Sequence, residues 1–147
     1  MMRGRGDKKA KVSPYVPGWI HDAVDEVARY RDHSLRIIPR EGEAAHALVM
    51  TAFHDTHTIN QLSPYFWRTY QRNDTIWPGH DSYEDIQALI GFHGLSVQRI
   101  HMRFSKLEIK DLLELKAALS IPIAHTVCAL LVLALKQERV VKLAARI

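Results

Sequence analysis

The first regular pattern of hydrophobic and polar positions lies in residues 13–32. Apolar side chains such as Ile20, Val24 and Val27 recur there every three or four positions, with charged residues between them. This spacing predicts an N-terminal amphipathic helix that begins after Pro17. Residues 1–12 contain five basic side chains and little apolar content, so we expect a disordered basic arm.

Residues 33–72 predict a strand followed by two helices. Residues 33–39 are short, β-branched at Ile37 and Ile38, and end at Pro39, as is typical of a strand. Residues 41–54 have helical spacing, residues 56–58 form a polar break, and a second helix is marked by Leu62, Phe66 and Tyr70. Residues 73–96 predict a linker, a loop followed by a short helix that ends at Gly91 or Gly94.

Residues 97–147 predict the same order of elements, with a helical extension at the C-terminus. Ser105 and Glu108 have the spacing of a capping box, which starts a helix that ends near residue 119. Residues 120–122 break this helix. Residues 123–136 predict a strongly apolar helix, which we expect to continue through Val140, Leu143 and Ile147.

The strand of this last segment has two chemically different faces. Ile100, Met102 and Phe104 alternate strictly with three basic residues, Arg99, His101 and Arg103. Because side chains on a strand point alternately to opposite sides, one face is apolar and the other basic.

The two strand-helix-helix segments are related by an offset of 65 residues, which places residues 36–72 on residues 101–137 without a gap. They share hydrophobic pattern and element order, with few identities. The second unit resembles the ribbon-helix-helix proteins of the Arc/MetJ type, through its alternating strand at 100–104, its capped helix, the turn at Ile121-Pro122 and the apolar helix after it. The first unit is a looser match.

This resemblance implies an α+β, mostly helical fold with two ribbon-helix-helix units fused in one chain as a pseudo-dimer. The units would share a two-stranded antiparallel ribbon, in which the strand near Leu35 pairs with the strand near Met102. The N-terminal helix and the linker helix would be additions to this fold. The turns before the second helices depart from the family, because they lack its usual glycine followed by serine or threonine.

The distribution of charge also favours a polyanionic partner. The net charge is +4, and the positive charge is concentrated in residues 1–12 and 97–147, whereas residues 13–96 are acidic overall. A two-stranded ribbon fits the major groove of DNA, where arginine can bind guanine through two hydrogen bonds.

We therefore predict two sets of DNA-contacting residues. The base-reading residues lie on the outer face of the ribbon: Arg99, His101, Arg103, Ser34, Arg36 and Ile38. The phosphate-binding residues lie at the start of each second helix and in the arm: Thr58, Ile59, Asn60, Ile123, Ala124, His125, Arg3, Arg5, Lys8, Lys9 and Lys11.

The sequence offers little support for an enzyme or a metalloprotein. The single cysteine, Cys128, lies in an apolar stretch and allows no intrachain disulfide, and no nucleotide-binding or nucleophile motif occurs. His54, Asp55 and His57 could supply metal ligands, but a zinc site needs three or four in fixed geometry, and we expect a solvated turn. We predict no catalytic residue, no metal and no cofactor.

The N-terminal residues have no apolar stretch behind their basic side chains, so we expect a cytoplasmic protein without a secretory signal. Residues 118–135 have about the length of a membrane span, but they include Ser120, Pro122 and His125, and we expect a buried helix.

The predicted function is sequence-specific binding of double-stranded DNA, as a transcriptional regulator or as an accessory factor of plasmid-type DNA transfer or partition. Further expected partners are a second copy of the chain or a protein of a DNA-processing complex, and no membrane. The alternative is a non-enzymatic helical protein-interaction module without DNA affinity.

Overall fold

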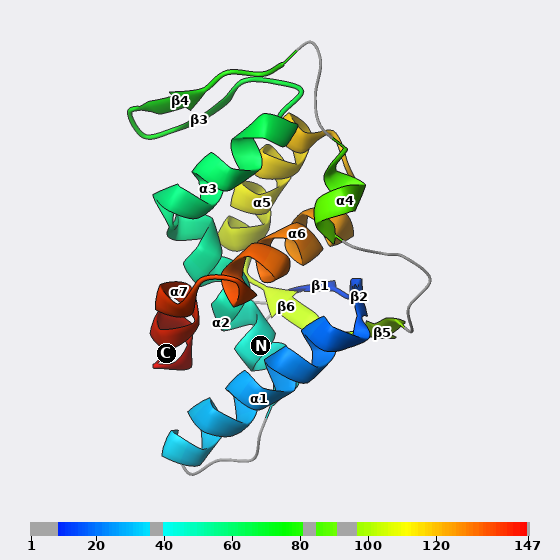
Figure 1. Ribbon diagram of the computed structural model, residues 1–147. Helices are drawn as coiled ribbons and strands as arrows, with labels where there is room; N and C mark the ends of the chain where they lie inside the picture. Colours follow the sequence, from blue (N-terminus) through cyan, green and yellow to red (C-terminus); the bar gives the residue numbers. More distant parts are fainter. Residues whose placement is uncertain (1–8, 36–39, 81–84, 91–96, 147) are drawn as a thin grey trace, which may run out of the picture.

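The computed structural model describes residues 9–35, 40–80, 85–90 and 97–146. These residues form seven α-helices, one short 3-10 helix and six short strands (Figure 1). The prediction of an α+β, mostly helical protein is therefore confirmed.

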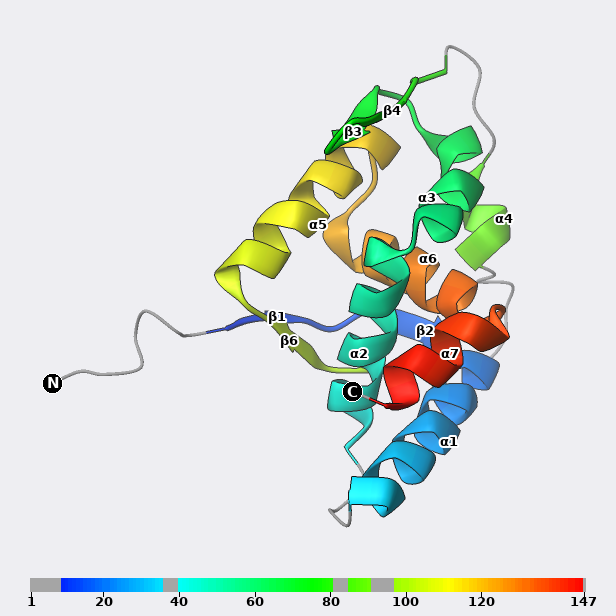
Figure 2. The same ribbon diagram turned by 90° about the vertical axis from the view of Figure 1, so that its left-hand side faces the viewer.

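The core is organised around helix α6, Ile123–Leu135. Residues 126–134 of this helix are all buried, because the sequence is apolar on every side and no polar face can turn to water. Helices α2 (Glu41–His54), α5 (Lys106–Leu119) and α4 (Ile86–Ile90) pack against α6 (Figures 1 and 2). Helix α1 (Gly18–Leu35) and helix α7 (Glu138–Ala145) pack against α2 at the other end of the molecule.

The capping box predicted for α5 is confirmed. The Ser105 hydroxyl accepts the N–H of Glu108 at 3.2 Å, and the Glu108 carboxylate accepts the N–H of Ser105 at 2.8 Å. The helix ends at Ser120, whose left-handed φ of 58° turns the chain into α6. The expected continuation of α6 to the C-terminus is wrong, because Gln137 is extended and α7 is a separate helix.

The segment after α2 differs from the prediction. The break is Asp55 alone, and α3 (Thr56–Leu62) begins directly after it, followed by the 3-10 helix η1 (Ser63–Tyr65). Beyond Tyr65 the predicted helix is wrong, since β3 (Tyr70–Arg72) and β4 (Thr75–Trp77) form an antiparallel hairpin. Its turn contains Asn73 with a φ of 55°, a conformation that asparagine accepts more readily than most residues.

The expected pairing of a strand near Leu35 with the strand near Met102 is also wrong. Residues 33–35 belong to α1, and residues 36–39 lie outside the described residues. Extending an existing helix by one turn costs little, whereas a short strand needs a partner to be stable. The partner of β6 (Met102–Phe104) is β1 (Ala10–Val12).

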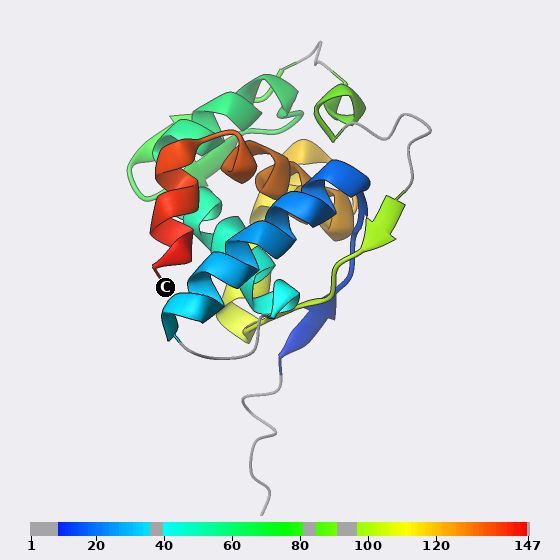
Figure 3. The ribbon, with the colours of Figure 1, turned by 60° about the horizontal axis from the view of Figure 1, so that its bottom comes forward.

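The N-terminal strands therefore occupy part of the predicted disordered arm and the residues directly before the predicted first helix, which begins after Pro17 as expected. Strand β2 (Tyr15–Pro17) pairs antiparallel with β5 (Val97–Arg99), next to the β1–β6 pair. Figure 3 shows these N-terminal strands running beside the chain that leads into α5.

Among the described helices, no single one is long and apolar enough to cross a membrane. Helices α5 and α6 have the required length and composition only as a pair, and they are bent by 92° relative to each other.

Candidate nucleic-acid interface

The four strands β1, β2, β5 and β6 form one ribbon in a single register. Ala10 is opposite Phe104 in one ladder and Tyr15 is opposite Arg99 in the other, so Ser13 faces His101 and Pro14 faces Ile100 between them. The N–H of Ile100 donates to the Pro14 carbonyl at 3.2 Å. Pro14 has no N–H to return this bond, which explains why the ladder is interrupted there.

Burial alternates along residues 12–16 and 100–104 of this ribbon. The inner side chains Val12, Val16, Ile100, Met102 and Phe104 are buried in the core. This confirms the prediction that the apolar face of residues 100–104 points inward. The opposite face is turned to solvent.

The outer face consists of three cross-strand pairs. Lys11 is opposite Arg103, and both side chains are exposed. The Ser13 hydroxyl and the Nδ1 atom of His101 are 2.7 Å apart. The third pair is Tyr15 and Arg99, in which the guanidinium carbon lies 4.5 Å from the centre of the tyrosine ring.

The Lys11–Arg103 pair is the unusual feature of this face. Like charges directly opposite each other on one face of an antiparallel pair destabilise it. Neither side chain makes a hydrogen bond or ion pair with a carboxylate within the part of the chain that the structure describes. An anion bound between them would remove the repulsion.

Two close contacts fix the ribbon to α2. At Gly42, an added Cβ atom would lie 2.3 Å from the carbonyl oxygen of His101, so only glycine allows the helix to approach this closely. The His46 ring lies 5.2 Å from the Phe104 ring, and its Nε2 atom is 3.0 Å from the Glu108 carboxylate. These contacts connect the ribbon, α2 and the start of α5.

Glu108 is ionised more readily than an ordinary glutamate. Burial raises its pKa, but the Ser105 N–H and the His46 imidazole outweigh burial, so that the net pKa is lowered. The Glu108 carboxylate is therefore charged at neutral pH, where it accepts the Ser105 N–H and caps α5.

The structure brings together only part of the predicted base-reading set. Arg99, His101 and Arg103 are exposed on the outer face of the ribbon. Ser34 belongs to α1, and Arg36 and Ile38 lie outside the described residues. The opposite strand contributes Lys11, Ser13 and Tyr15 instead. The sequence contained a signal for this strand, because residues 9–16 alternate between polar and apolar positions.

The predicted phosphate-binding residues are scattered. Lys9 and Lys11 are exposed beside the ribbon, and Arg3, Arg5 and Lys8 lie outside the described residues. In α3, Thr58 and Ile59 are buried and Asn60 accepts the indole N–H of Trp77 at 2.8 Å. At the start of α6, Ile123, Ala124 and His125 are half-buried.

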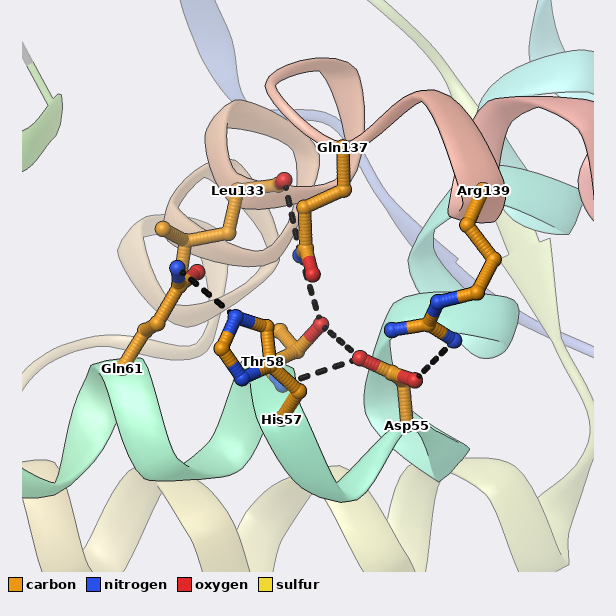
Figure 4. Close-up of polar contacts among 7 residues, drawn as sticks. All are labelled: Asp55, His57, Thr58, Gln61, Leu133, Gln137 and Arg139. Atoms are coloured by element: carbon orange, nitrogen blue, oxygen red, sulfur yellow. Dashed lines mark hydrogen bonds and ion pairs between the residues drawn. The ribbon is translucent and has the colours of Figure 1, made fainter.

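The turn at residues 54–57 has a structural role, which Figure 4 shows. Asp55 caps α3, accepting the N–H of Thr58 at 2.9 Å and its hydroxyl at 2.8 Å. Its other oxygen accepts from Arg139 of α7 at 2.6 Å, and Gln137 donates to the Thr58 hydroxyl at 2.8 Å. The turn is thus bonded to the segment that leads into α7.

This environment changes the acidity of Asp55. The pKa of Asp55 lies below its ordinary value, mainly because of the hydrogen bond from Arg139. Burial raises this pKa, and the hydrogen bonds from Thr58 lower it further. Asp55 is therefore held as a carboxylate.

The described residues contain no group of three or more His, Cys, Asp or Glu side chains that could hold a metal ion. Cys128 is buried in α6, and burial raises the pKa of its thiol to about 12. Its thiolate is too scarce at neutral pH for nucleophilic chemistry.

Comparison of the chain with protein-family models, with curated proteins and with solved structures finds no match.

Proposed function

We propose that this protein binds double-stranded DNA through the outer face of the β1/β2–β5/β6 ribbon. The observation that carries the proposal is the Lys11–Arg103 pair, in which two cations lie directly opposite each other with no described carboxylate partner. A chain of phosphates beside the ribbon would neutralise this pair, and a base edge would provide acceptors for Arg103.

The outer face has the chemistry and the spacing for contact with a duplex. Alternate residues on a strand are about 7 Å apart, which is about twice the rise per base pair. Arg99, His101 and Arg103 follow each other at this spacing and present hydrogen-bond donors. The stacked Tyr15 ring restrains the Arg99 side chain, so less conformational entropy is lost when it binds.

The ribbon-helix-helix resemblance applies to the second unit in this proposal, where β6, α5 and α6 follow in the expected order. The N-terminal strand β1 takes the place that a second unit's strand has in that family. Either setting implied by the resemblance, transcriptional regulation or an accessory role in DNA transfer or partition, would use such a surface.

The alternative function, a helical interaction module without DNA affinity, is favoured by one observation. Leu107 is 74% exposed and Leu113 is 46% exposed on α5, which gives this helix apolar contacts to offer a protein partner or a second copy.

The test is a titration of fluorescent duplexes selected from a random pool, followed by anisotropy at several salt concentrations. Arg103→Ala should lose about 1–3 kcal/mol of discrimination at particular base pairs. Arg103→Lys keeps the charge and should retain the salt dependence while weakening the base preference, since lysine lacks the planar guanidinium fork.

Arg68→Ala is the matched control, because Arg68 is exposed in the loop before β3, where its backbone N–H donates to the Ala118 carbonyl of α5 at 3.2 Å. Its affinity and preference should equal those of the wild type. If folded Arg103→Ala also equals the wild type, the ribbon is not the reading element. If the wild type binds no duplex at low salt, the interaction module is the better interpretation.

A further inference from the structure

A cleft of about 530 Å³ separates the ribbon from the start of α2. The ribbon side of the cleft consists of Lys9, His101 and Arg103, and the α2 side consists of Arg40, Gly42, Glu43, His46 and Ala47. Gly42 allows the two walls to approach closely, because a Cβ atom at this position would lie 2.3 Å from the His101 carbonyl oxygen.

The cleft has an excess of positive charge. Lys9, Arg40 and Arg103 are cations, and Glu43 is the one carboxylate among the lining residues that the structure describes. Glu43 accepts a hydrogen bond from Arg40 at 3.1 Å, so these two charges largely cancel. Lys9 and Arg103 have no carboxylate partner within the described part of the chain.

Two imidazoles add further hydrogen-bonding capacity. His46 uses Nε2 for Glu108, and His101 uses Nδ1 for Ser13. Each ring thus has a second nitrogen for which the described residues supply no hydrogen bond. Lysine, arginine and histidine side chains on two facing walls suit a ligand that carries several acceptor oxygens in a compact, charged group.

We infer that this cleft binds a phosphate group. A carboxylate has two oxygens and suits a single arginine, whereas a phosphate can accept from both walls at once. A cleft of about 530 Å³ has room for more than one phosphate, so the group can be part of a larger molecule, either the DNA backbone or a nucleotide. In the first case the inference rests on the proposed function, and in the second it is independent of it.

The experiment follows the imidazole signals of His46 and His101 by NMR in the full chain at pH 7, assigned with His46→Gln and His101→Gln. The probes are sodium pyrophosphate and a 16-bp duplex, with sodium chloride at matched ionic strength as the blank. Pyrophosphate should shift both signals. Lys9→Gln should weaken its binding about two- to fivefold, and Lys110→Gln, which changes an exposed lysine of α5 outside the cleft, should not.

The titration with the 16-bp duplex distinguishes the two possible sources of the phosphate. If the duplex shifts the same two signals, the cleft holds a backbone phosphate; if it binds without shifting them, the ligand is a nucleotide. If pyrophosphate shifts both signals and no duplex binds, the cleft inference stands and the DNA proposal fails. If neither probe shifts them at about 10 mM, the inference is overturned, even where duplex binding elsewhere supports the proposed function.

Discussion

Replacing Asp55 by alanine removes the cap of α3 and the link between that cap and α7. Asp55 is only 11% exposed, and its carboxylate accepts three hydrogen bonds, two from Thr58 and one from Arg139. Thr58 is fully buried, so its N–H depends on Asp55 for a hydrogen-bond partner.

The magnitude follows from these contacts. Loss of an N-cap costs about 0.5–2 kcal/mol, and a buried donor without a partner brings the cost to the upper end of this range. We expect Asp55→Ala to lower the free energy of unfolding by about 2 kcal/mol. For a chain of this length the loss corresponds to a fall of about 4–8 °C in the melting temperature.

Asp55→Asn separates the cap from the charge, because asparagine caps a helix about as well as aspartate but offers no ion pair to Arg139. It should lose less than half as much stability as Asp55→Ala. The measurements are calorimetry and urea unfolding, with Asp22→Ala as a control, since Asp22 is exposed on α1. The control should stay within about 0.5 kcal/mol of the wild type.

The lowered pKa of Asp55 adds a dependence on pH. The folded pKa is below that of the unfolded chain, so the charge contributes its full stabilisation above about pH 4 and loses it as the pH falls through the folded pKa. Asp55→Asn should therefore lose less stability than the wild type on acidification. Equal losses in Asp55→Asn and Asp55→Ala at pH 7, or an unchanged melting temperature in Asp55→Ala, would refute the capping argument.

Three further predictions concern the ribbon and the core. Gly42→Ala should destabilise the fold by about 1–3 kcal/mol in urea unfolding, because the new Cβ atom meets the His101 carbonyl; a gain in stability, usual for glycine to alanine within a helix, would contradict the contact. Cys128 should resist alkylation by iodoacetamide at pH 8 until the protein unfolds, and rapid native-state labelling would show that it is not buried. Lys11→Gln removes the repulsion from Arg103, so it should raise the melting temperature of the free protein by about 1–2 °C at 10 mM salt and by less at 150 mM. The same substitution should weaken duplex binding about fivefold, and a fall in both stability and affinity would argue against this repulsion.

Local patterns predicted the elements that local interactions determine. The bounds of α2, the capping box at Ser105 and the inward face of residues 100–104 all depend on residues within a few positions of one another. The outward position of Arg99, His101 and Arg103 followed from the same alternation.

The errors arose where distant parts of the chain decide the structure. Residues 33–35 have no property that forbids a strand, and they are helical because they continue α1. The true partner of β6 lies in a segment whose basic residues suggested a disordered arm, so Lys11 and Tyr15 were missed as members of the ribbon. The hairpin of β3 and β4 was missed because its strands are three residues each.

The ribbon also has a consequence for how the protein folds. Its two sides, residues 10–17 and 97–104, are joined by a segment that makes up more than half of the chain. Closing so long a loop carries a high entropic cost, and contacts distant in sequence slow folding. During synthesis the first strand must wait, unpaired, until the strand that precedes α5 has left the ribosome. The basic surface therefore cannot form until both sides of the ribbon have been made, and α6, around which the core is organised, leaves the ribosome only after them.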